Sequence, residues 1–187
     1  MYRDGICEVE EGLFSQTVSF SDISYQSARK DAQEAVFSAW CQLFDSFGAD
    51  SSVQLSVVNT PMPADELGNR TFFDESDPTT GRFAAEYNRI LNDKMREGVS
   101  NLERHRWLTY AVRADDADAA VPKLAHIRSD VTASLNRIHC EVGRLDGTER
   151  MRAIDSVIRP CKRFEFSWDK LSQFRGMRTK DLVAPNL

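Results

Sequence analysis

Two long amphipathic segments, each set between two β-rich runs, constrain the fold of this chain more than any other feature of its sequence. Apolar residues recur at the helical i, i+3 and i+4 spacing from Ala32 to Phe47 and again from Ala120 to Ile138. The runs on either side are rich in β-branched and aromatic residues. In chain order we therefore predict a strand at 14–20, a helix at 25–47, strands at 53–58 and 105–113, a helix at 118–138 and a strand at 139–145.

This βαββαβ order predicts an α+β fold, a ferredoxin-like split βαβ in which both helices cover one face of a four-stranded antiparallel sheet. A β-rich run at 6–10 adds an N-terminal hairpin with 14–20, and a short helix is expected at 148–158. The weaker helical pattern at 83–97 predicts an inserted helix. We expect a ferredoxin-like domain over 1–160, with an insertion at about 61–99, and an extended tail over 161–187.

The composition bounds the class of protein. A chain of 187 residues can bury a sizeable core, and 41% hydrophobic with 28% charged residues is ordinary for a soluble domain. No apolar run reaches the roughly 20 residues of a membrane helix, and the first residues lack the apolar run of a signal peptide. The net charge of -5 gives no general attraction to nucleic acid or anionic lipid. Four cysteines without a CxxC pair favour reduced thiols in a cytosolic protein.

The motifs of catalysis are missing. No G-x-x-x-x-G-K-[ST] sequence is present, so no loop can wrap the phosphates of a nucleotide as a P-loop does. The three histidines stand apart from one another and from any cysteine at a zinc-ligand spacing. We therefore expect no catalytic residue, no cofactor and no metal site in this chain.

Aromatic residues mark the candidate interaction surface, because aromatic anchors are typical of interface centres. The inserted helix carries Phe83 and Tyr87, the exposed sheet face carries Trp107, and the C-terminal stretch carries Phe164, Phe166 and Trp168. Core packing is the alternative for each, with the C-terminal three on one face of an edge strand.

Basic residues concentrate in the same C-terminal stretch. Arg159, Lys162 and Arg163 form a candidate basic patch, and aromatic residues interleave with basic ones in single-strand nucleic-acid surfaces.

Short motifs spread over nearly the whole chain resemble one family in their order and spacing. They resemble the start of the VirB/TrbE/CagE-type conjugal-transfer (type IV secretion) ATPases carried by Gram-positive mobile elements. The motifs are Met1-Tyr2-x-Asp4-Gly5-Ile6-Cys7, Ser21-Asp22-Ile23-x-Tyr25-Gln26, Phe44-Asp45-Ser46-Phe47, Gln54-Leu55-Ser56, Arg106-Trp107-Leu108-Thr109-Tyr110, Leu145-Asp146-Gly147-Thr148-Glu149-Arg150, Phe166-Ser167-Trp168-Asp169 and Lys180-Asp181-Leu182-Val183-Ala184-Pro185.

The resemblance implies a large cytoplasmic ATPase that works as an oligomer at the inner face of the cell membrane and powers DNA transfer. Its ATP and magnesium sites belong to a C-terminal P-loop domain, which this sequence does not contain, so we expect the front part of a longer protein. The resemblance gives this part a docking role toward secretion-channel components, toward its own ATPase domain or toward neighbouring copies, with membrane association only through partners.

Two alternatives to this docking role stay open. The first is a nucleic-acid-binding module that uses the basic and aromatic C-terminal stretch, and the second is an orphan ferredoxin-like domain that binds a small ligand.

Overall fold

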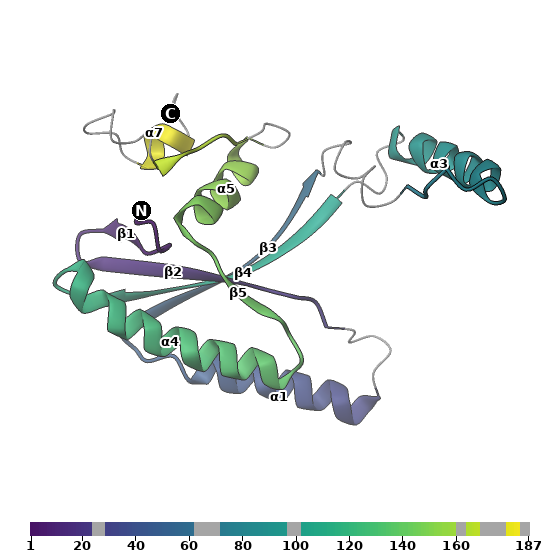
Figure 1. Ribbon diagram of the computed structural model, residues 1–187. Coiled ribbons are helices and arrows are strands. Elements are labelled where there is room, and N and C mark those ends of the chain that lie inside the picture. The colour runs from purple at the N-terminus through teal and green to yellow at the C-terminus, as the bar shows by residue number, and fades with distance from the viewer. Residues whose placement is uncertain (24–28, 62–71, 97–101, 160–163, 169–178, 184–187) are drawn as a thin grey trace.

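The computed structural model describes residues 1–23, 29–61, 72–96, 102–159, 164–168 and 179–183. A twisted antiparallel sheet lies at its centre, with two long helices packed on one face (Figure 1). The predicted α+β class is therefore confirmed. No helix in the described part of the chain is long and apolar enough to cross a membrane.

The sheet has five strands, and every pair in it is antiparallel. β2 (Leu13–Phe20) pairs with β4 (Leu102–Arg113), which in turn pairs with β3 (Ser51–Pro61). The other edge of β2 is shared. β1 (Cys7–Glu10) pairs with its first half across a turn at Gly12, and β5 (Val142–Arg144) pairs with its second half.

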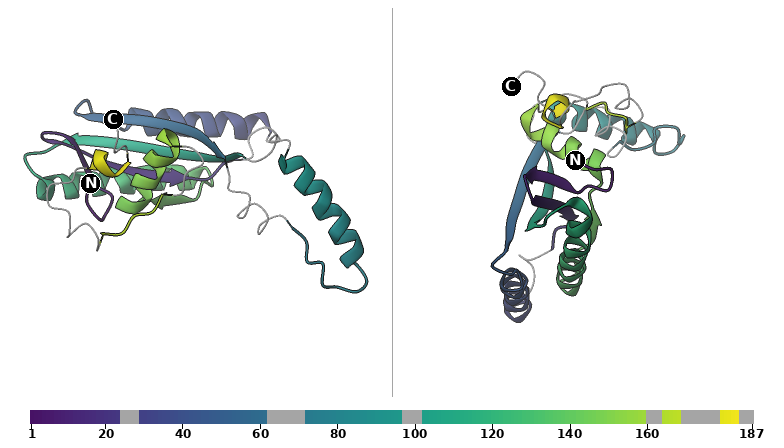
Figure 2. Two further views of the ribbon diagram at one scale, coloured as in Figure 1. Left: turned by 90° about the horizontal axis from the view of Figure 1, so that it is seen from above. Right: turned by 90° about the vertical axis from the view of Figure 1, so that its left-hand side faces the viewer.

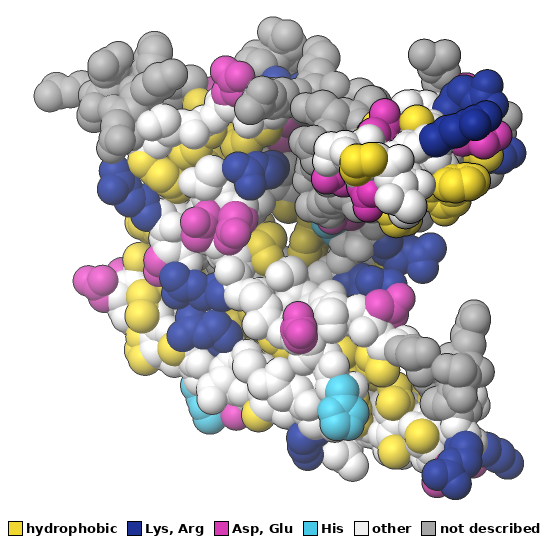
Figure 3. Space-filling model, turned by 45° about the vertical axis from the view of Figure 1, so that its right-hand side comes forward, with side chains coloured by type: hydrophobic (Ala, Val, Ile, Leu, Met, Phe, Trp, Pro, Cys, Tyr) yellow, Lys and Arg dark blue, Asp and Glu magenta, His cyan; other side chains and the backbone are white. Residues whose placement is uncertain are grey.

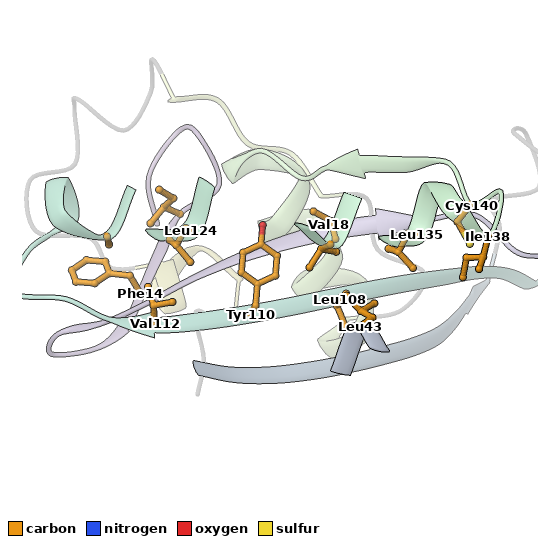
Figure 4. Packing of buried hydrophobic residues seen from close by; sticks show 13 residues of the cluster. Phe14, Val18, Leu43, Leu108, Tyr110, Val112, Leu124, Leu135, Ile138 and Cys140 are labelled. Atoms are coloured by element: carbon orange, nitrogen blue, oxygen red, sulfur yellow. The ribbon is translucent and has the colours of Figure 1, made fainter. Parts of the chain in front are cut away.

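The helices α1 (Lys30–Asp45) and α4 (Ala117–Arg137) lie side by side on one face of the sheet (Figures 1 and 2). Their apolar stripes supply Leu43, Leu124 and Leu135, which meet Val18, Leu108 and Tyr110 of the strands in the core (Figure 4). At the start of α4, Asp116 accepts a hydrogen bond from the Ala119 N–H, as expected of a capping aspartate.

The second face of the sheet is partly covered as well. The helix α5 (Gly147–Ile158) crosses it, and the short helix α7 (Thr179–Val183) packs on α5. Ser15 and Thr17 are consequently buried, although they alternate with the apolar residues of β2. The expectation of an exposed second face is therefore wrong at its β2 side, because α5 covers it.

The helix α3 (Gly81–Arg96) confirms the predicted inserted helix. It lies beyond the ends of β3 and β4, away from the sheet (Figures 1 and 2). At this end of the sheet, Pro61 of β3 pairs with Leu102 of β4. α3 makes no extensive contact with any other described helix or strand.

Several boundaries differ from the prediction. β3 is longer than 53–58, since it pairs with β4 along its whole length. The strand expected at 139–145 is shorter and comprises only β5 (Val142–Arg144). The first residues of the expected strand still belong to the end of α4, because His139 takes the left-handed conformation (φ 63) and the Cys140 N–H donates to the Leu135 carbonyl. The helix expected at 25–47 begins at Lys30 among the described residues.

Candidate interaction site

The segment before α3 is folded onto the helix by one buried asparagine. The Asn88 side chain accepts a hydrogen bond from the Phe73 N–H at 2.9 Å and donates to the Phe73 carbonyl at 2.9 Å. It also donates to Glu75 Oε1 at 2.7 Å. Gly81 has no room for a Cβ, which would collide with the Glu75 carbonyl. These contacts make residues 72–96 a small unit with its own packing.

Two aspartates shape the turns that lead into the helix. Asp74 accepts a hydrogen bond from the Ser76 N–H at 2.9 Å, and Asp77 accepts one from the Thr79 N–H at 2.7 Å. These backbone hydrogen bonds hold the pKa of both carboxyls below the usual range. Both aspartates are therefore anionic at neutral pH and fix the approach to α3.

One face of α3 carries large apolar side chains that nothing in the described chain covers. Phe83, Tyr87 and Ile90 follow one another at i, i+4 and i+7 and are 72%, 49% and 49% exposed. Phe73, 59% exposed, packs edge-on against Tyr87 with ring centroids 5.2 Å apart. We call these four residues the α3 patch. The predicted candidates Phe83 and Tyr87 thus lie together, and Phe73 and Ile90 join them.

Charged residues of both signs border the α3 patch. Arg82, Glu86, Arg89 and Asp93 are all exposed on the same helix. Figure 3 shows hydrophobic side chains beside positive and negative ones on this part of the surface. An apolar centre with a charged rim is the arrangement of a protein-binding surface rather than of a catalytic pocket.

Trp107 lies elsewhere, half-buried in the middle of β4 on the face that α5 crosses. Its ring stacks on the His105 ring with centroids 5.4 Å apart, and His105 Nε2 hydrogen-bonds Thr60 Oγ1 at 2.9 Å. The structure does not bring Trp107 together with the α3 patch.

The C-terminal aromatic residues pack within the chain. Phe166 contacts Phe164 and Trp168, with ring centroids 6.0 and 5.0 Å away. The Trp168 indole N–H donates to Thr148 Oγ1 at 2.9 Å, and its ring fills the space where Gly147 would carry a Cβ. Residues 164–167 are irregular, so the alternative of an edge strand is wrong here. This cluster fastens the described part of the predicted tail to α5.

Of the candidate basic patch, only Arg159 is described. Its guanidinium forms an ion pair with the buried Asp155 carboxylate and also donates to the Leu182 carbonyl at 3.4 Å. Arg159 therefore joins α5 to α7. Lys162 and Arg163 lie outside the described residues.

Sequence reasoning missed a cleft between α5 and the sheet. It has a volume of about 630 Å³ and is lined by apolar residues of α5 and of the strands, with serine, threonine and glutamine side chains of the strands among them. Arg150 lies at its inner end, buried, and donates to the carbonyls of Gly5 and Ser15 at 2.6 and 2.8 Å. The serine and threonine alternation along β2 was a signal of a polar sheet face, but the position of α5 was not predictable from it.

The described residues contain no group of three or more histidine, cysteine or acidic side chains that could hold a metal ion. No family model matches the chain, and no curated protein matches it either.

Proposed function

We propose that this chain is the non-catalytic docking and assembly domain of a conjugative DNA-transfer (type IV secretion) ATPase, built on a ferredoxin-like core. The observation that carries the docking role is the α3 patch, an aromatic helix face at the far end of two strands that no other described element covers. The conjugative setting rests on the order of the sequence motifs.

The strand order supports the ferredoxin-like assignment. Leaving out the hairpin arm β1, the sheet runs β5-β2-β4-β3, which is the order 4-1-3-2 of a split βαβ. Both crossover helices, α1 and α4, lie on one face, as this fold requires. Three features are additional to a split βαβ fold: the strand β1, the inserted helix α3 and the helix α5 on the second face of the sheet.

Exposure makes α3 the natural contact element. Phe83, Tyr87 and Ile90 are 49% to 72% exposed, so burying the rest of each would contribute about 1 to 2 kcal/mol, enough for a set of interface anchors. The partner we propose is a component of the secretion channel at the inner face of the cell membrane. ATP and magnesium then belong to a P-loop domain of the same ATPase.

The nucleic-acid alternative has less support, because Arg159 is engaged by Asp155 and is no free cation for a phosphate. It still predicts salt-dependent binding of single-stranded DNA that weakens when Arg159, Lys162 and Arg163 become alanine. The small-ligand alternative is favoured by one observation, the mainly apolar cleft between α5 and the sheet, which Arg150 also lines.

Site-specific photocrosslinking in donor cells tests the docking role. A photoreactive phenylalanine in place of Phe83 should crosslink to a channel component. The matched position is Ala85, which is exposed on the opposite side of the same helix and should give no such product. Equal crosslinking from both positions, or none from position 83, would remove α3 as the docking element.

A further inference from the structure

The outer edge of β3 is long and neutral, and no described strand covers it. β3 pairs only with β4 among the described strands and forms the rim of the sheet (Figure 2). Its 11 residues span about 36 Å at the usual rise of roughly 3.3 Å per residue. None of them is ionisable, although natural edge strands are commonly protected by lysine or other charged side chains. This edge is open to a further strand.

An apolar surface continues from this edge onto α1. Val53, Leu55 and Val57 stand opposite Tyr110, Leu108 and Arg106 of β4, so their side chains share the helix-bearing face of the sheet. Leu55 and Val57 remain 46% and 58% exposed. Phe37 of α1, 67% exposed, lines the same groove of about 370 Å³. The described chain thus leaves apolar side chains uncovered in the middle of this edge, at Leu55 and Val57.

We propose that β3 pairs with β3 of a second copy of this chain, in antiparallel register about a twofold axis at Leu55. A twofold axis perpendicular to the sheet keeps the helices of both copies on the same side and pairs residues of equal parity. Leu55 then stands opposite Leu55 of the second copy, and Val53 stands opposite Val57. The three central cross-strand pairs on that face are apolar, and Ser51 stands opposite Asn59 at each end.

The second copy fits this edge better than an unrelated strand for two reasons. The register is self-complementary, and no like charges meet along it, because the strand has no charged residue. The groove beside α1 adds the exposed ring of Phe37 to the apolar surface next to the strand edge. The dimer forms whether or not the α3 patch docks on a channel component.

Light scattering coupled to size-exclusion chromatography measures the predicted assembly. The wild-type chain is expected at twice its mass of 21.2 kDa, and Leu55→Lys is expected at the monomer mass, because two lysines would face each other at the axis. Val9→Lys is the matched control, since Val9 is 62% exposed on β1 at the opposite edge, and it should remain a dimer. Far-UV circular dichroism of each variant verifies the fold.

A crosslink tests the register. In a Cys41→Ser background, which removes an exposed thiol, Leu55→Cys should oxidise to a disulfide-linked dimer, since residues directly opposite have Cβ atoms about 5 Å apart. Ser52→Cys should not, because its two copies would lie about 20 Å apart. A wild-type chain that is monomeric at every concentration overturns the proposal and leaves the edge to a strand of another protein. A dimer that survives Leu55→Lys, or that Val9→Lys dissociates, overturns it too.

Discussion

The guanidinium of Arg150 joins three segments that are far apart in the sequence. It reaches from α5 to the Gly5 carbonyl near the N-terminus and to both the carbonyl and the hydroxyl of Ser15 in β2. No carboxylate of the described chain forms an ion pair with it, and burial lowers its pKa. Its hydrogen bonds to neutral oxygens therefore hold a buried charge in place.

We expect Arg150→Met to lower the free energy of unfolding by about 1 to 3 kcal/mol, because buried carbonyls lose their donors. Urea denaturation measures this change. Arg152→Met is the control, because Arg152 is exposed on the same helix and its loss should change stability little. Equal losses in the two variants would show that Arg150 does not join these segments.

A second buried polar group lies under α4. Gln16 Oε1 accepts hydrogen bonds from the Tyr110 hydroxyl at 3.0 Å and from Arg128 at 3.4 Å. The alternation of side chains along β2 puts Gln16 on the same face as Phe14 and Val18, but the sequence does not reveal its partners, which lie 94 and 112 residues away. Burial raises the pKa of Tyr110 well above its ordinary value of 10.0.

Because the pKa of Tyr110 is raised, the effect of Tyr110→Phe on the free energy of unfolding should depend on pH. Below pH 10.0 the variant should lose about 1 kcal/mol, because Gln16 loses a donor. The neutral phenol is favoured in the fold, so its contribution is fully present below pH 10.0 and is lost as the pH rises toward the folded-state pKa. Above that point the wild type should therefore lose about 1.4 kcal/mol per pH unit relative to the variant, so that the difference reaches zero within about one pH unit and then reverses. Urea denaturation along a pH series measures it, and a difference independent of pH would contradict this account.

Among the described helices and strands longer than three residues, α3 contributes no residue to the hydrophobic core cluster and makes no extensive contact with another element. Its only described packing is with residues 72–80, through Asn88 and the Phe73–Tyr87 contact. Its apolar positions in the sequence predicted a helix, although a weaker one than the two core helices. Periodicity alone could not tell that no other described element would cover them.

Replacing residues 62–101 with an Asn-Gly turn tests this separation. Pro61 and Leu102 stand directly opposite each other, so a two-residue turn can join them. We expect the thermal midpoint to stay the same or to rise, since a shorter loop costs less closure entropy. Cooperative unfolding followed by circular dichroism provides the measurement. A large fall in the midpoint would mean that the insertion supports the core.

At the scale of the whole molecule, the sequence predicted the layered α+β arrangement because two amphipathic stripes between β-rich runs leave few other solutions. It did not predict that α5 would cover part of the second face of the sheet. The C-terminal aromatics read equally well as a strand or as an interface. What decides between them is the contact of Trp168 with Gly147 and Thr148, which is a long-range contact that no local pattern contains.

The central claim is that the α3 patch docks this chain onto a conjugative channel. Conjugative transfer from donor cells that carry Phe83→Ser with Tyr87→Ser tests it most directly, against Ala85→Ser with Asn92→Ser on the opposite side of the helix. We predict that the first pair lowers the transfer frequency by about tenfold or more, as the loss of interface anchors does, at an unchanged protein level. The second pair should leave the frequency unchanged. Wild-type transfer with Phe83→Ser and Tyr87→Ser would contradict the claim.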